Sequence, residues 1–145
     1  MVVSGTDTGA RMRVLVYSDK AETREQVRMA VGRRPAADVP RVELVECATA
    51  PVVIRRLEST DPAERIDVAI LDGEAAPVGG MGLCRQLKDE IFRCPPILLL
   101  VGRRDDGWLA TWSRAEQVVS HPIDPVALAE SLAELMRQRA AALSG

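Results

Sequence analysis

Residues 67–83 read DVAILDGEAAPVGGMGL, and this stretch decides the fold. Four consecutive apolar residues, Val68 to Leu71, are typical of a strand that is buried on both faces of a parallel sheet. Asp72 follows directly, and a loop rich in glycine and proline then leads into a helical pattern. A carboxylate in this position lies at the C-terminal end of a strand, where ligands bind in open α/β sheets. The pattern therefore predicts that Asp72 is the chemical centre of the chain.

Other apolar runs predict the remaining strands, at residues 14–17, 42–47, 97–101 and 118–119. Apolar residues at helical spacing predict a helix after each strand. The fourth helix, at residues 108–114, is at most two turns long, and the last is capped by Asp124 with Pro125 at its first position. Strands that alternate with helices imply right-handed crossovers and a doubly wound α/β fold, with a parallel sheet covered on both faces.

The composition favours one soluble globular domain. The chain has 145 residues, an apolar fraction of 47% and a net charge of −2, and its basic and acidic residues are too well mixed for a DNA-binding patch. No apolar segment is long enough to span a membrane. Residues 1–12 lack the hydrophobic stretch of a secretory signal, and we expect a flexible lead-in there. Cys47, Cys84 and Cys94 lack metal-ligand spacing, which predicts free thiols in a reducing cytoplasm.

The order of motifs resembles the receiver domains of bacterial two-component response regulators. The motifs are VLVYSDK (14–20), DVAILD (67–72), GGMGLCRQLK (79–88), PPILLLVGRRDD (95–106) and SHPIDPVAL (120–128). The resemblance covers residues 13–142, and it implies a flavodoxin-like sheet of five strands in the order 2-1-3-4-5. We expect a single receiver-like domain without an output domain.

The resemblance also implies a site. In that family a carboxylate after the third strand attacks a phosphoryl group donated by a histidine kinase, and Mg²⁺, a lysine and a hydroxyl stabilise the transferred group. Matched by motif, the phosphoacceptor position falls on Asp72. The metal ligands fall on Asp19, Asp72 and the backbone carbonyl of Glu74. The hydroxyl position falls on Val101 and the lysine position on His121.

Several of these positions depart from the family pattern. Ser18 replaces an acid and removes one charge from the metal site, so that any Mg²⁺ binding is expected to be weak. Val101 has no hydroxyl, and His121 is shorter than lysine and mostly uncharged near pH 7. Val118 stands where the family has an aromatic switch residue. These departures indicate an atypical receiver.

Each candidate residue also has a plainer interpretation. Asp72 could end a strand without doing chemistry, and Asp19 could cap the first helix instead of binding metal. His121 could be a polar residue in a vacated lysine position. The glycines of residues 79–82 could cradle a phosphate at a helix N-terminus, although such loops more often serve backbone geometry.

Trp108 and Trp112 are two of only four aromatic residues, and they stand one helical turn apart. In receivers, the face built from the fourth helix, the fifth strand and the fifth helix commonly engages partners. One interpretation places both tryptophans in the core. The other makes them part of a surface for a partner protein or for a second copy of the chain, because tryptophan is enriched at binding hot spots.

Three functions follow from these observations. The first is a cytoplasmic stand-alone signalling receiver, not an enzyme, which takes a phosphoryl group from a sensor histidine kinase or another signalling protein. Its output passes through protein contacts or homodimerisation, without direct binding to nucleic acid or membrane. The second is a pseudo-receiver that works as an interaction module independently of phosphorylation. The third, a flavodoxin-like enzyme with flavin or nucleotide, is disfavoured because YSDKAETR (17–24) lacks a glycine for a phosphate loop.

Overall fold

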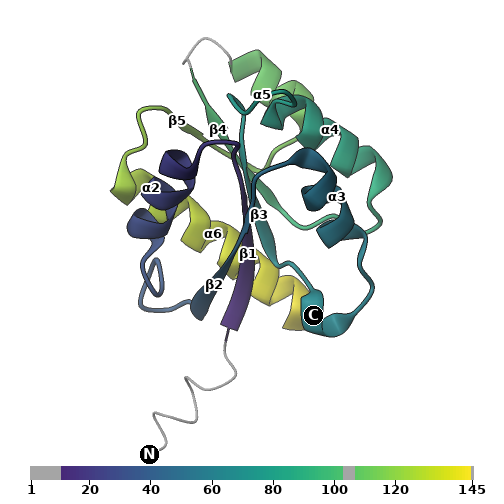
Figure 1. The fold of residues 1–145 in the computed structure, drawn as a ribbon. Helices are drawn as coiled ribbons and strands as arrows, with labels where there is room; N and C mark the ends of the chain where they lie inside the picture. Colours follow the sequence, from purple (N-terminus) through teal and green to yellow (C-terminus); the bar gives the residue numbers. More distant parts are fainter. Residues whose placement is uncertain (1–10, 103–106, 145) are drawn as a thin grey trace, which may run out of the picture.

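The computed structural model describes residues 11–102 and 107–144. Its centre is a parallel sheet in the order β2-β1-β3-β4-β5, as predicted (Figure 1). The strands are β1 (Arg11–Tyr17), β2 (Arg41–Cys47), β3 (Val68–Asp72), β4 (Ile97–Val101) and β5 (Gln117–Ser120). The short β3 is central, and all of its residues are buried. This burial explains its continuous apolar sequence.

The helices occupy the segments that apolar spacing predicted. They are α2 (Ala21–Val31), α3 (Ala50–Glu58), α4 (Gly80–Glu90), α5 (Gly107–Ser113) and α6 (Pro125–Ser144), with a 3₁₀ turn η1 (Pro62–Glu64) before β3. Helix α2 ends at Gly32, which has a φ of 61° and serves as the glycine C-cap. Helix α6 begins at Pro125, where Asp124 Oδ1 accepts a 3.0 Å hydrogen bond from the Val126 amide. The predicted Asp124 cap is confirmed.

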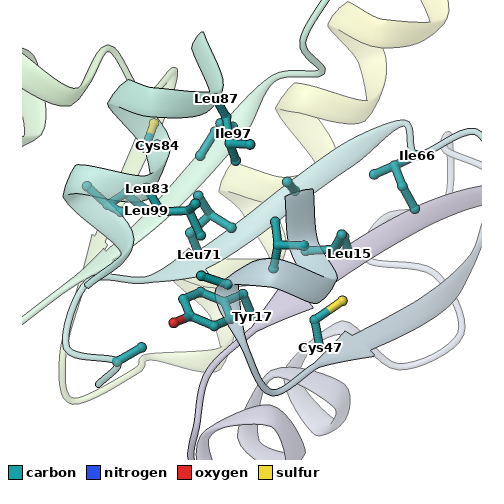
Figure 2. Packing of buried hydrophobic residues seen from close by; sticks show 14 of the residues in the cluster. Leu15, Tyr17, Cys47, Ile66, Leu71, Leu83, Cys84, Leu87, Ile97 and Leu99 are labelled. Carbon is teal, nitrogen blue, oxygen red and sulfur yellow. The ribbon is translucent and has the colours of Figure 1, made fainter. Parts of the chain in front are cut away.

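The helices form two layers, one on each face of the sheet. Helices α2 and α6 cover one face and α3 and α4 cover the other (Figure 1). Successive residues of β3 alternate between the layers: Val68 and Ile70 pack under α2 and α6, and Ala69 and Leu71 pack under α3 and α4. Figure 2 shows the second of these layers, with Leu71 among its labelled residues.

Strand β1 begins earlier than its apolar run indicated. Arg11 and Met12, which we placed in the lead-in, pair with the start of β2. Met12 is buried in the layer beneath α2 and α6, and this contact extends the strand beyond Val14. The other lead-in residues, 1–10, lie outside the described residues.

Two further predictions concern the membrane and the cysteines. Among the described residues, no helix has both the length and the apolar character to cross a membrane. The three cysteines are free, as predicted. Burial raises the pKa of the Cys84 thiol to about 11.

Candidate functional site

Asp72 ends β3 between β1 and β4, at the edge of the sheet where the C-terminal strand ends meet. Its exposed fraction is 1%. One carboxylate oxygen, Oδ2, accepts a 2.8 Å hydrogen bond from the hydroxyl of Ser18. The other, Oδ1, accepts a 2.9 Å bond from the backbone amide of Glu74. Both oxygens are therefore engaged within the protein.

Ser18 is held as firmly as Asp72. It follows β1 directly and is completely buried. Its Oγ accepts a 3.1 Å hydrogen bond from the Lys20 amide, and its carbonyl accepts a 2.7 Å bond from Arg24 Nη1. From the sequence we interpreted Ser18 only as a lost charge. Since adjacent parallel strands end at the same edge of a sheet, its position after β1 was the available signal that it could reach Asp72.

His121 lies beside the same carboxylate. Its Nε2 is 3.5 Å from Asp72 Oδ1, a contact that is too long for a good hydrogen bond. This nitrogen is buried and has no hydrogen-bond partner in the described part of the chain. The backbone amide of His121 donates a 2.7 Å bond to the carbonyl of Val101, which holds the residue at the sheet edge. The position assigned to the family's lysine thus lies against Asp72.

Asp19 does not take the capping role that one interpretation gave it. The N-cap residue of α2 is Lys20, and no side chain caps that helix, so the capping interpretation is wrong. Instead, Asp19 Oδ1 accepts a 3.1 Å hydrogen bond from the Ala76 amide. The carboxylate thereby joins the loop after β1 to the loop after β3. The two residues are 57 positions apart in the chain and meet only in the folded protein.

The described side chains do not form a ready magnesium site. Mg²⁺ demands near-octahedral oxygen coordination at short distances. Within residues 11–102 and 107–144, no group of three or more acidic, histidine or cysteine side chains is placed to hold a metal ion. The carboxylate of Glu74 lies against Gly102, in the space that a Cβ atom there would need. Among the described residues, the candidate ligands implied by the family resemblance are the Asp19 and Asp72 carboxylates and the Glu74 carbonyl.

The two switch positions, Val101 and Val118, are both aliphatic, but one is buried and the other is exposed to solvent. Val101 is buried in the layer beneath α3 and α4, and its side chain has no hydrogen-bond donor. Val118, on β5, is 40% exposed. Neither side chain can couple the state of Asp72 to the surface through a hydroxyl or a rotating ring.

The glycines before α4 serve close packing. Gly79 is the N-cap residue of α4. A Cβ atom at Gly80 would lie 2.7 Å from the carbonyl carbon and oxygen of Asp72, and one at Gly73 would lie 2.6 Å from the Leu100 carbonyl oxygen. Close backbone contacts therefore account for Gly80 and for Gly73, in agreement with the plainer interpretation, whereas Gly82 has nothing within 4 Å.

Tyr17 is a member of the site that the sequence did not point to. The ring, labelled in Figure 2, is 1% exposed in the layer beneath α3 and α4. Its hydroxyl donates a 2.7 Å hydrogen bond to the Val78 carbonyl. Burial first, and then the charges of Asp19 and Asp72, raise the pKa of the phenol. Tyr17 thus fastens the loop after β3 to the end of β1.

The two tryptophans lie on the surface, so the interpretation that places both in the core is wrong. Trp108 is 69% exposed and Trp112 is 45% exposed. Helix α5 instead contacts α4 through the buried Ser113, whose carbonyl accepts a hydrogen bond from the Cys84 thiol. The guanidinium of Arg85 lies 5.1 Å from the centroid of the Trp112 ring, and its Nη1 donates a 2.8 Å bond to the Trp112 carbonyl.

Comparison with known proteins assigns the family. No protein-family model matches the chain. The response regulatory proteins MT3230 and Rv3143, from two strains of Mycobacterium tuberculosis, are each 53% identical to it over 131 residues, which is 90% of this chain and 96% of theirs.

Solved structures agree in fold. The signal receiver domain of an HD domain-containing protein from Pseudomonas fluorescens Pf-5 matches 94% of this chain and 95% of its own, with a TM-score of 0.73 and 14% identity. The receiver domain of Francisella response regulator 1452 matches 88% of this chain and 98% of its own, with a TM-score of 0.71 and 12% identity. The parallel sheet in the order 2-1-3-4-5, the acid at the end of β3 and the identity to the mycobacterial proteins place this chain in the response-regulator receiver family.

Proposed function

We propose that this receiver is a two-component-type signalling protein that acts through protein–protein contacts, and that its Asp72 site works as a structural element without phosphoryl transfer. The observation that carries this proposal is the buried hydrogen bond from Ser18 to Asp72. The Ser18 hydroxyl and the Glu74 amide occupy both carboxylate oxygens of Asp72 with protein donors, and a serine at position 18 contributes no negative charge toward a cation. On this proposal the protein is not an enzyme, and it meets its partners in the cytoplasm.

The chemistry of phosphoryl transfer gives a second reason. The transferred group carries charge on its equatorial oxygens, which must be matched by a metal ion and fixed cations. Around Asp72 the fixed groups are a hydroxyl at Ser18, an imidazole at His121 and the amide of Glu74. The nearby Glu74 carboxylate adds a negative charge at the same edge. This set offers little compensation for a phosphoryl group.

The output surface that we propose is the exposed side of α5 and β5. It consists of Trp108, Trp112 and Val118, which we call the tryptophan face. The stacking of Arg85 against Trp112 orders one of these rings before any partner arrives. Exposed, ordered aromatic side chains are the usual anchors of protein interfaces. The partner is a signalling protein such as a sensor histidine kinase, or a second copy of this chain.

A second candidate function keeps Asp72 as a phosphoacceptor. Its support is the position of the carboxylate at the end of the central strand, with Asp19 also retained after β1. This candidate requires the Ser18 hydroxyl to turn away from Asp72. It also requires Mg²⁺, held weakly by the Asp19 and Asp72 carboxylates and the Glu74 carbonyl.

One titration separates the two candidates. Amide NMR spectra of the ¹⁵N-labelled protein are recorded with MgCl₂ alone and then with MgCl₂ and beryllofluoride, a phosphoryl mimic. We expect no saturable shifts around Asp72 and none on β5 or α5. Saturable shifts that start at Asp72, extend to the tryptophan face and vanish in Asp72→Asn would establish the phosphoacceptor and overturn our first proposal. Intact mass after incubation with acetyl phosphate provides an independent readout.

The tryptophan face is tested by self-association and by kinase binding. Sedimentation velocity of the wild type is compared with that of Trp108→Ala/Trp112→Ala. Phe92→Ala is the matched control, since Phe92 is an aromatic residue that is 85% exposed and lies in the α4–β4 loop, outside α5 and β5. We expect each lost tryptophan to raise the dissociation constant, for self-association or for a purified partner, by at least tenfold. This corresponds to about 1.4 kcal/mol for each ring. Equal losses in Phe92→Ala would contradict a specific role for this face.

A further inference from the structure

A concave site lies at the opposite edge of the sheet from Asp72. It is a cavity of about 680 Å³, walled by the end of α3, η1, the α4–β4 loop and the last turns of α6. Figure 1 shows the C-terminal end of α6 beside η1 at the bottom of the molecule. Its volume lies within the range of about 300–1,000 Å³ that is usual for small-molecule sites. Nothing in the receiver site described above uses it.

Positive charge dominates the walls of this cavity. The four segments each contribute one arginine: Arg56, Arg65, Arg93 and Arg139. The single acid among the lining residues is Asp61, whose Oδ1 already accepts a 2.9 Å hydrogen bond from the Ala63 amide. A second carboxylate, Asp67, lies buried beneath the cavity. Guanidinium groups therefore outnumber carboxylates by four to two.

Two of the arginines share one carboxylate. Arg65 Nε lies 3.1 Å from Asp67 Oδ1, and Arg139 Nε lies 3.6 Å from the same oxygen. The other oxygen, Oδ2, is occupied by the Arg13 amide at 3.0 Å. Arg139 Nε is buried and has no hydrogen-bond partner in the described part of the chain. Within the described residues this nitrogen has only the long ion pair with Asp67, and two guanidinium groups share that one carboxylate, which leaves a net positive charge beside the cavity.

The other two arginines have no carboxylate within 4.0 Å among the described residues. Arg56 lies in the last turn of α3. Arg93 holds its guanidinium 5.2 Å from the centroid of the Phe92 ring. Phe92 is 85% exposed, which is unusual for a phenylalanine. The α4–β4 loop thus presents a flat aromatic ring and a flat cation next to each other.

From these features we infer that the cavity binds a nucleotide. The arginines supply bidentate donors that fit phosphate oxygens, and Phe92 with Arg93 supplies planes on which a base can stack. Apolar side chains of Leu57, Ile66, Ile91 and Leu143 line the space between them and suit the ribose and base edges. A free phosphate would fill only a small part of the volume and would leave the aromatic ring unused.

The test uses the full chain with three probes: GTP, pyrophosphate and guanosine. Binding is measured by calorimetry, and the site is located by amide NMR shifts. We expect GTP to bind with shifts at Ile66, Phe92 and Leu143, and pyrophosphate and guanosine each to bind at least tenfold more weakly. Arg56→Ala should lower GTP affinity about tenfold. Arg55→Ala is the matched control, since Arg55 is exposed on the same turn of α3 and lies outside the cavity.

Several outcomes would overturn the assignment. Equal affinity for GTP and pyrophosphate would show a simple anion site, and equal losses in Arg55→Ala and Arg56→Ala would show unspecific charge attraction. An RNA oligonucleotide that binds more tightly than GTP, with shifts extending to Arg11 and Arg41, would show a polyanion surface. Absence of shifts at the cavity would also end the proposal. Phe92→Ala, at an exposed position where folding is not at risk, should weaken GTP but not pyrophosphate.

Discussion

The hydroxyl of Ser18 and the carboxylate of Asp72, 54 positions apart in the chain, form a buried hydrogen bond of 2.8 Å at the active edge of the sheet. The bond joins the ends of the two neighbouring strands β1 and β3. The serine places a neutral donor against Asp72 at a position where a carboxylate would add negative charge. This pair explains how the site can remain folded and closed without metal.

Ser18→Asp should rebuild the requirement for a cation. A second carboxylate against the buried Asp72 is expected to lower the free energy of unfolding by about 3 kcal/mol without divalent ions. Mg²⁺ should restore part of this loss, because it would bind the folded state only. Urea unfolding with and without MgCl₂ measures both effects.

The control for this experiment is Ser18→Ala. It removes the hydrogen bond to Asp72 and should cost about 1 kcal/mol, with no response to Mg²⁺. A Ser18→Asp protein as stable as the wild type in EDTA would show that the site is open to solvent, contrary to the burial described above.

Gly80 and Gly82 form a matched pair on α4. Gly80→Ala should destabilise the protein by about 1–3 kcal/mol, because the new Cβ meets the Asp72 backbone at 2.7 Å. Gly82→Ala should stabilise it by about 1 kcal/mol, since nothing lies within 4 Å and alanine favours the helix. Thermal and urea unfolding of both variants provide the comparison. If the two substitutions had the same sign, the close approach of α4 to Asp72 would be in doubt.

Tyr17 should make stability fall in alkaline solution. Burial, followed by the charges of Asp19 and Asp72, raises its pKa above the ordinary value of 10.0. The unfolded chain then loses the phenolic proton first as the pH rises. The contribution of Tyr17 to stability is therefore fully present below pH 10 and is lost as the pH rises through the folded-state pKa, at up to about 1.4 kcal/mol per pH unit.

The variant Tyr17→Phe isolates this effect from the other titrating groups. It removes the hydrogen bond to the Val78 carbonyl and should cost about 1 kcal/mol near neutral pH. Above pH 10, the free energy of unfolding of Tyr17→Phe should fall less steeply with pH than that of the wild type, because the variant has no tyrosine to titrate. Since the chain has a single tyrosine, tyrosinate absorbance reports on Tyr17 alone. If the free energy of unfolding fell with the same slope above pH 10 in both proteins, the raised pKa of Tyr17 would be refuted.

The tryptophan face should be visible by fluorescence quenching. Acrylamide should quench the native protein almost as well as the urea-unfolded protein, because both rings are exposed to solvent. Single-tryptophan variants separate the two rings: Trp108, in Trp112→Phe, should be quenched more strongly than Trp112, in Trp108→Phe. Weak quenching of both at low protein concentration would mean that the rings are covered within one chain. Quenching that weakens as the protein concentration rises would instead indicate self-association through this face.

The sequence by itself determined the architecture and the location of the site. The apolar run before Asp72 could be read because a strand covered on both faces must be apolar throughout, and Val68 to Leu71 satisfy this requirement locally. The short α5 and the Asp124 cap followed from equally local patterns. Each of these features depends on residues that are neighbours in the sequence, and the sequence alone is therefore enough to predict it.

Only the tertiary structure decided what the site residues touch. One interpretation made Asp19 a helix cap, but its carboxylate accepts a hydrogen bond from the Ala76 amide. Ser18, which we interpreted only as a lost charge, donates a hydrogen bond to Asp72. Trp108 and Trp112 lie outside the core because α5 buries Ser113 instead. The arginine cavity brings together side chains from four separate segments. A side chain's partners depend on which strand ends and loops meet in space, and spacing along the chain does not contain that information.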